Sequence, residues 1–220
     1  MTTSKRGRPR LTDRRRSGAT PEEEILDAAA ELFAANGFAR TSTRAIAEAV
    51  GVRQASLYHH FATKDDILDS LLVRTVDTPL RLAHWLSASE HPAAQRLWAM
   101  AWFDAHQLLA SKWNLGVLLQ LPETRDPKFA QFFGKRSALR AAYVELARDV
   151  GGDLHARLPF HFVEAAIQLR VEEARWVADV GPAAVACGIA DSVLRTVGYV
   201  GDVGGVRAGG AALLTEFENQ

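Results

Sequence analysis

The feature that most constrains the fold is a pair of short amphipathic stretches that meet at Gly51. The first stretch covers about residues 43–50 and the second runs from residue 53 or 54 to residue 60, and both space their apolar residues as α-helices do. Glycine at the junction ends the first helix, because it adopts left-handed backbone conformations at little cost. Two short helices joined by a tight turn form a helix-turn-helix, which lays its second helix in the major groove of DNA. The segment therefore predicts a DNA-binding unit.

Helices are also predicted on both sides of this motif. Thr20 and Glu23 form a capping box that starts a helix, and Asn36 followed by glycine ends it. Thr63 is expected to cap a further helix. We expect that helix to end near Pro79, because proline interrupts helices.

The rest of the chain predicts a larger helical bundle, and no run of alternating β-branched residues predicts a strand. Prolines lie at or near the ends of the expected helices, which cover about residues 92–111, 115–120, 127–150, 159–180 and 182–199. Beyond Tyr199 several glycines loosen the chain, and only a short turn is expected over residues 211–217. The predicted fold is all-α, with a disordered basic arm over residues 1–19, a helix-turn-helix domain over 20–75 and a helical bundle over 76–220.

The charge of the chain is concentrated at its N-terminus. Lys and Arg total 26, as do Asp and Glu, yet residues 1–20 hold seven Lys or Arg against one Asp. Such a basic end suggests a polyanionic partner. Arg6-Gly7-Arg8-Pro9 matches the core of the AT-hook, which inserts arginines into a narrow minor groove. Arg6 and Arg8 are therefore candidate DNA contacts, while an electrostatic tail that reads no sequence remains the alternative.

Composition excludes several other classes. One cysteine, Cys187, allows neither an internal disulfide nor a multi-cysteine zinc site. No apolar run reaches the 18 or so residues of a membrane span, and the N-terminus lacks the apolar region of a secretory signal. Motifs of zinc proteases, serine hydrolases and P-loop NTPases are absent. We therefore expect a cytoplasmic protein that is not an enzyme, makes no membrane contact, and has no catalytic residue, metal or cofactor.

The second helix of the motif carries side chains suited to reading DNA. Glutamine pairs with adenine, arginine with guanine, and serine or tyrosine with phosphate. The outward side chains expected to do so are Arg53, Gln54, Ser56, Tyr58 and His59. Thr43, Arg44 and Lys64 lie near helix N-termini, where backbone N–H groups also attract phosphate. Leu57 and Phe61 are expected in the core.

Over about residues 21–72 the sequence resembles the TetR family of transcriptional regulators. The matching residues are Asn36-Gly37-Phe38, Thr43, Ile46-Ala47, Gly51-Val52, Leu57-Tyr58-His59-His60-Phe61, Lys64 and Leu68. The resemblance implies an all-α homodimer with an N-terminal three-helix helix-turn-helix DNA-binding domain and a C-terminal helical-bundle domain for ligand binding and dimerisation. It also implies that certain residues touch DNA, namely Thr43, Arg44, Gln54, Ser56, Tyr58, His60 and Lys64. Ala55 departs from the family, where glycine or proline is frequent, which leaves the operator sequence open.

A small-molecule site is expected in the C-terminal bundle. All five tryptophans lie there, and on the stretch 92–111 Trp98, Trp102 and His106 share one helix face. A mostly apolar cavity with a few polar anchors suits a small molecule. The candidate lining residues are Trp98, Trp102, His106, Trp113, Phe133 and Arg170. An ordinary well-packed core is the alternative explanation of the aromatic stripe.

The helices expected at about 159–180 and 182–199 are the candidate dimer contact. Both carry continuous stripes of apolar or small residues, and two such helices per subunit would build a four-helix bundle across a twofold axis. Burial of the same faces inside one subunit is the alternative.

The sequence thus favours a ligand-responsive transcriptional regulator, in the form of a repressor that a small, largely apolar effector releases from a palindromic operator on double-stranded DNA. An architectural DNA-binding protein without an effector is the alternative. A helical enzyme that keeps a vestigial DNA-binding domain would need a catalytic constellation that the sequence does not contain. A metabolite that changes operator affinity would separate the first two hypotheses.

Overall fold

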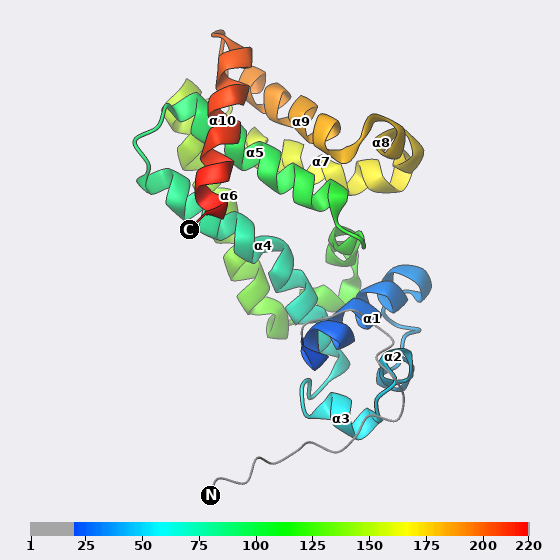
Figure 1. Cartoon of the computed structure of the whole chain (residues 1–220). Coiled ribbons are helices and arrows are strands. Elements are labelled where there is room, and N and C mark those ends of the chain that lie inside the picture. Colours follow the sequence, from blue (N-terminus) through cyan, green and yellow to red (C-terminus); the bar gives the residue numbers. More distant parts are fainter. Residues whose placement is uncertain (1–19, 220) are drawn as a thin grey trace, which may run out of the picture. The chain divides into compact units, whose positions relative to one another are not determined.

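The computed structural model describes residues 20–219, which form helices joined by turns and loops, with no strand in that range. The chain divides into two compact units, with the boundary between Leu71 and Leu72 (Figure 1). The predicted all-α class is confirmed. The boundary lies a few residues before the one expected after residue 75. The arm over residues 1–19, with Arg6 and Arg8, lies outside the described residues.

The first unit contains α1 (Pro21–Asn36), α2 (Thr43–Val50), α3 (Gln54–Tyr58) and the start of α4 (Lys64–Ala88). The first two helices have the predicted bounds, whereas α3 ends two residues earlier than expected. Apolar side chains from all four helices and their loops fill one core, which includes Ile25, Phe33, Phe38, Ile46, Leu57, Phe61 and Leu68.

Side-chain caps explain where these helices begin. The Thr20 hydroxyl accepts a hydrogen bond from the Glu23 amide at 3.2 Å, and the Glu23 carboxylate accepts one from the Thr20 amide at 3.1 Å. Thr63 and Asp66 form the same reciprocal pair at the start of α4. Gly51 ends α2 in the left-handed conformation, with φ 79° and ψ 29°. Each cap satisfies backbone groups that the helix leaves unpaired, and each involves residues close in sequence.

The prediction that α4 ends near Pro79 is wrong, because the helix continues to Ala88. Proline has no N–H group, so the carbonyl of Thr75, four residues earlier, loses its helical donor. The side-chain amide of Gln107 donates to this carbonyl at 2.9 Å. Pro79 itself is buried. A donor from a neighbouring helix therefore replaces the missing hydrogen bond, and α4 passes through the proline.

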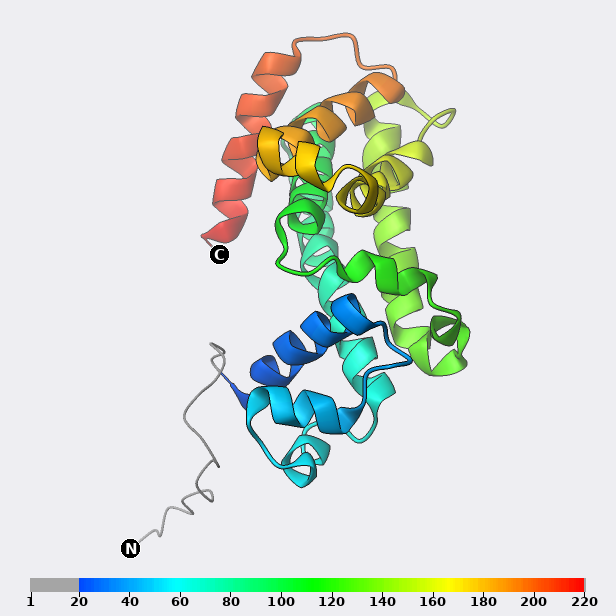
Figure 2. The ribbon, with the colours of Figure 1, turned by 90° about the vertical axis from the view of Figure 1, so that its right-hand side faces the viewer.

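The second unit is built around α5 (Ala93–Ala110) (Figure 2). It packs against α6 (Ala130–Gly151), α7 (Leu158–Glu172), α9 (Pro182–Thr196) and α10 (Val203–Glu218). Three short 3-10 helices join α5 to α6, namely η1 (Leu115–Gln120), η2 (Pro122–Arg125) and η3 (Pro127–Phe129).

The single helix expected over residues 159–180 is wrong, because it is broken into α7 and α8 (Ala174–Val180). Glu173, between them, has φ −123° and ψ 30°, outside the α-helical region, so the hydrogen-bond ladder stops there. The helix expected over 182–199 is α9, which ends at Thr196.

The expectation that only a short turn forms beyond Tyr199 is also wrong, because α10 is a helix of 16 residues. Asp202 caps it by accepting hydrogen bonds from the amides of Gly204 and Gly205. A Cβ on Gly210 would lie 2.5 Å from Cε3 of Trp98 on α5, so only glycine allows this approach. Close packing on α5 therefore outweighs the low helix propensity of glycine.

No single helix within residues 20–219 is long and apolar enough to cross a membrane. The segments α8 and α9 meet that criterion only as a pair, and they are bent by 99° at the break between them.

Candidate nucleic-acid interface and cavities

Three polar side chains join the start of α2 to α3 on the exposed side of the helix-turn-helix. The amide of Gln54 donates to the Thr43 hydroxyl at 3.0 Å and to the Tyr58 hydroxyl at 3.3 Å. The hydroxyls of Thr43 and Tyr58 are 3.1 Å apart and share a hydrogen bond. Tyr58 is 47% exposed, whereas Leu57 beside it is fully buried and anchors α3. These contacts hold three surface side chains in defined rotamers before any ligand binds.

The other candidate DNA contacts of this region lie on the same unit. Arg53, Ser56, His59 and His60 are exposed. Nε of Arg44 donates to the Glu48 carboxylate at 2.9 Å, and this hydrogen bond raises the pKa of the Arg44 guanidinium. Because the pair is exposed, the remaining N–H groups of the guanidinium face solvent.

Lys64 has a structural role that the sequence analysis missed. Its ammonium donates to the carbonyls of Phe38 and Thr41 at 2.8 and 2.9 Å, and it lies 4.2 Å from the centre of the Phe38 ring. These contacts close the loop between α1 and α2. Two of the three ammonium donors are therefore engaged within the unit, and a phosphate contact would use the third.

In the second unit, the aromatic stripe of α5 begins in the core. Trp98 is 4% exposed, and its indole N–H donates to Asp191 of α9 at 3.0 Å. Arg207 of α10 also pairs with Asp191. Trp102 stacks between Trp98 and His106, with ring centres 6.3 and 4.6 Å away. The stripe thus connects α5 to α9 and α10 at one end.

Two cavities flank η1 and share Gly116. The first has a volume of about 340 Å³, and its polar lining residues are Arg136, Glu164 and Gln168, with Phe133 on its apolar wall. The second has a volume of about 230 Å³ and is lined by Arg74, Thr75, Gln107, Leu108, Ser111 and Asn114, together with Leu115.

Two of the six candidate ligand residues lie at these cavities. Phe133 lines the first. Arg170 contacts two lining residues of the second cavity, because its guanidinium donates to the Leu108 carbonyl at 2.8 Å and to the Ser111 hydroxyl at 2.9 Å. The lining residues of the two cavities do not include Trp98, Trp102, His106 or Trp113.

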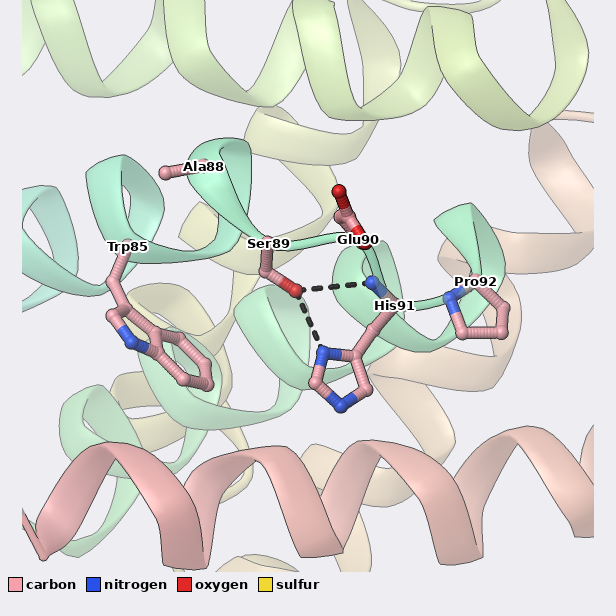
Figure 3. A pocket seen from close by; sticks show the side chains of 6 residues that line it. All are labelled: Trp85, Ala88, Ser89, Glu90, His91 and Pro92. Carbon is pink, nitrogen blue, oxygen red and sulfur yellow. Dashed lines mark hydrogen bonds between the residues drawn. The ribbon is translucent and has the colours of Figure 1, made fainter.

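A third cavity, of about 510 Å³, lies at the turn between α4 and α5 (Figure 3). The Ser89 hydroxyl at its wall hydrogen-bonds both Nδ1 and the backbone amide of His91, at 2.8 and 3.2 Å. These two polar side chains therefore brace the turn itself.

A buried carboxylate lies beside the second cavity. Burial raises the pKa of Asp104 to about 6. Gln107 donates to its Oδ1 at 2.9 Å, and the Tyr143 hydroxyl of α6 donates to its Oδ2 at 3.1 Å. Burial and the nearby carboxylate also raise the pKa of Tyr143. The sequence signal for this site is an aspartate between alanine and aromatic residues on a helix face that is otherwise apolar.

Comparison with known proteins agrees with these features. Residues 25–71 match the family model described as bacterial regulatory proteins, tetR family. The chain is 48% identical to Mycobacterium smegmatis AmtR, whose crystal structure superposes with a TM-score of 0.81 over 92% of this chain and 98% of that one. It is 32% identical to the putative mycofactocin biosynthesis transcriptional regulator MftR of Mycobacterium tuberculosis, over 63% of this chain and 69% of MftR.

A shorter match covers the helix-turn-helix. The transcriptional repressor KstR2 of Mycobacterium tuberculosis is 47% identical over 49 residues, which are 22% of this chain and 24% of KstR2. The chain thus spans about a quarter of the length of that relative. The family model and these relatives agree on the N-terminal unit, and AmtR and MftR extend the agreement into the bundle. The chain therefore belongs to the TetR family of bacterial regulatory proteins, whose members regulate transcription and are not enzymes.

Proposed function

We propose that this protein is a transcriptional repressor that releases a palindromic operator when a small molecule binds its second unit. The observation that carries this proposal is the hydrogen-bonded cluster of Thr43, Gln54 and Tyr58 on the exposed side of the helix-turn-helix. Gln54 is the proposed base-reading residue, since an amide can pair with both N6 and N7 of adenine. On DNA its amide would exchange the hydrogen bond to the Thr43 or Tyr58 hydroxyl for the one to N7. The proposed supporting contacts are Arg44, Arg53, Ser56, His59, His60 and Lys64, with Arg6 and Arg8 in the minor groove.

A dimer of this chain would present two helix-turn-helix units to two half-sites, about one helical turn apart or a multiple of that. Members of the family act as dimers. We propose the exposed faces of α7, α8 and α9 as the contact. Large apolar side chains exposed on α7 and α8 are Phe162, Val171, Trp176 and Val180. On α9, Ala184 and Gly188 are exposed, and a Cβ on Gly188 would have no neighbour within 4 Å.

The opposite faces of α7 and α8 are filled inside the unit. Val163, Ala166, Ile167 and Val177 are buried there. These four side chains pack inside one subunit, and the proposed dimer contact uses the other side of the helices.

The proposed effector site lies in the second unit, at the cavities beside η1. They combine apolar walls with a few polar side chains, as small-molecule sites do. An effector would release DNA only if it bound one arrangement of the protein more tightly than the other. An architectural DNA-binding protein would keep the same operator affinity in the presence of every metabolite.

Gln54→Ala is the direct test of the DNA-binding face. A bidentate base contact contributes about 1–3 kcal/mol of discrimination, so the affinity for an operator selected from random DNA should fall by about 5- to 150-fold. The measurement is fluorescence anisotropy at one fixed salt concentration, because phosphate contacts depend on salt. Gln131→Ala, at an exposed position of α6, is the matched control and should bind normally. Equal affinities for both variants would overturn the assignment of Gln54.

A further inference from the structure

The smaller of the two cavities beside η1 lies at the proline of α4. Its wall includes Thr75, whose carbonyl lacks a helical donor because of Pro79, and Gln107, which supplies that donor from α5. The same amide nitrogen of Gln107 also donates to Asp104. Both hydrogens of this side-chain amide are therefore engaged by protein groups.

The other neutral polar side chains of the cavity are also engaged. The amide of Asn114 donates to the Ile167 carbonyl at 3.0 Å. The Ser111 hydroxyl accepts from Arg170 and donates to the Trp113 carbonyl at 3.0 Å. A ligand would have to break one of these bonds to gain a donor from Gln107 or Ser111, whereas Asn114 offers its second amide hydrogen as a neutral donor.

Arg74 is different. It is exposed, lines the cavity, and forms neither a salt bridge nor a side-chain hydrogen bond with any other residue in the range 20–219. No acidic residue is among the described residues that line this cavity. Among the described residues of the lining, the guanidinium is thus the only charged group, and its five N–H donors form a planar fork that fits a carboxylate.

We propose that this cavity binds a small monocarboxylate, with its carboxylate on Arg74 and its apolar body against Leu108, Leu115 and Gly116. The volume of about 230 Å³ is below the usual range for drug-sized ligands and fits on the order of ten non-hydrogen atoms. An arginine–carboxylate contact can form two parallel hydrogen bonds, which orients the ligand as well as holding it. The binding of a carboxylate here does not depend on the proposed function. Only the identification of this ligand as the effector rests on it.

The test uses the full chain without DNA and a panel of straight-chain carboxylates of four to eight carbons, each paired with the primary alcohol of the same length. Binding is measured by isothermal titration calorimetry and by ligand-observed NMR. We expect one site per chain, and a carboxylate that binds about tenfold more tightly than its alcohol, since hydrogen bonds between charged partners are the stronger ones.

Arg74→Gln should weaken carboxylate binding about tenfold and leave alcohol binding unchanged. Arg140→Gln, at an exposed position of α6 outside the lining, is the matched control and should bind like the wild type. Leu108→Trp should fill the cavity and remove binding of both classes. The proposal is wrong if no carboxylate of the panel binds, if the alcohols bind equally well, or if the two arginine variants behave alike.

The same panel separates this proposal from the proposed function. If the carboxylates bind through Arg74 and leave operator affinity unchanged, the site is correct and its role as the effector site is wrong. If another metabolite releases the operator while no carboxylate binds, the repressor assignment is supported and the carboxylate site is rejected.

Discussion

Asp104→Asn is expected to raise the unfolding free energy at pH 7 by about 3 kcal/mol. The carboxyl of Asp104 has a pKa of about 6 in the folded protein, against 3.8 for an ordinary aspartate, because it is buried in the bundle. Ionised aspartate at neutral pH therefore destabilises the folded state. An amide at this position carries no charge and can keep the local hydrogen bonds, since it accepts from Gln107 and donates to the Tyr143 oxygen, whose own hydrogen then goes to the Met100 carbonyl.

The stabilisation by Asp104→Asn is expected to depend on pH. Because the folded pKa is raised, the stabilisation by protonated Asp104 is fully present below about pH 4 and is lost as the pH rises through 6. The advantage of the amide variant should accordingly be small near pH 4 and reach its full size above pH 7. Urea denaturation at several pH values measures it.

Asp179→Asn is the control for this experiment, because Asp179 lies on α8 with a largely exposed carboxylate. It should leave the unfolding free energy and its pH dependence almost unchanged. A variant Asp104→Asn that is less stable than the wild type at pH 8, or that keeps the wild-type pH profile, would show that the buried carboxylate is not destabilising.

Gln107→Leu is expected to lower the unfolding free energy by about 3 kcal/mol, since a buried acceptor left without a donor costs about 1–3 kcal/mol and this change leaves one buried and one partly buried acceptor without its donor. One is the Thr75 carbonyl, and the other is Oδ1 of Asp104. The measurement is chemical denaturation at pH 7 of the purified variant and the wild type.

Pro79→Ala tests how much of the stability lost in Gln107→Leu is due to the N–H group that proline lacks. Alanine restores an N–H group that can donate to the Thr75 carbonyl within α4, so Gln107→Leu should cost about 1–2 kcal/mol less in this background. A double-mutant cycle measures the difference. Gln168→Leu, on α7, is the control and should be additive with Pro79→Ala. If Gln107→Leu were also additive with Pro79→Ala, the amide of Gln107 would not replace the hydrogen bond that Pro79 removes.

The parts of the fold that could be predicted from the sequence are those fixed by neighbouring residues. Thr20 with Glu23, and Thr63 with Asp66, start helices through contacts three residues apart, and Gly51 ends one by its own backbone preference. Such signals are visible in a short window of sequence, so the bounds of α1 and α2 were predictable.

The helices that were predicted wrongly depend on contacts between residues far apart in the sequence. Whether α4 passes Pro79 depends on Gln107, 28 positions away, and whether a glycine-rich segment forms α10 depends on Trp98, more than a hundred positions away. The side of α5 that faces the core is set by such contacts as well. The ligand site on the stripe of Trp98, Trp102 and His106 stays a prediction, while the two cavities beside η1 are lined by other residues, among them Arg74, Gln107 and Phe133.

The contact between Gly210 and Trp98 also fixes the position of α10 along α5. A shift of α10 by one helical turn would bring Val206 or Leu214 to the place where even a Cβ is too large. A rotation by one residue in one direction would bring Ala211 there, which also carries a Cβ. A rotation in the other direction would put Ala208 in the place of Gly209, where a Cβ would lie 2.3 Å from the side chain of Gln95. The helix therefore has a single docking register and no neighbouring register of similar energy, so we expect it to attach and detach as one cooperative segment.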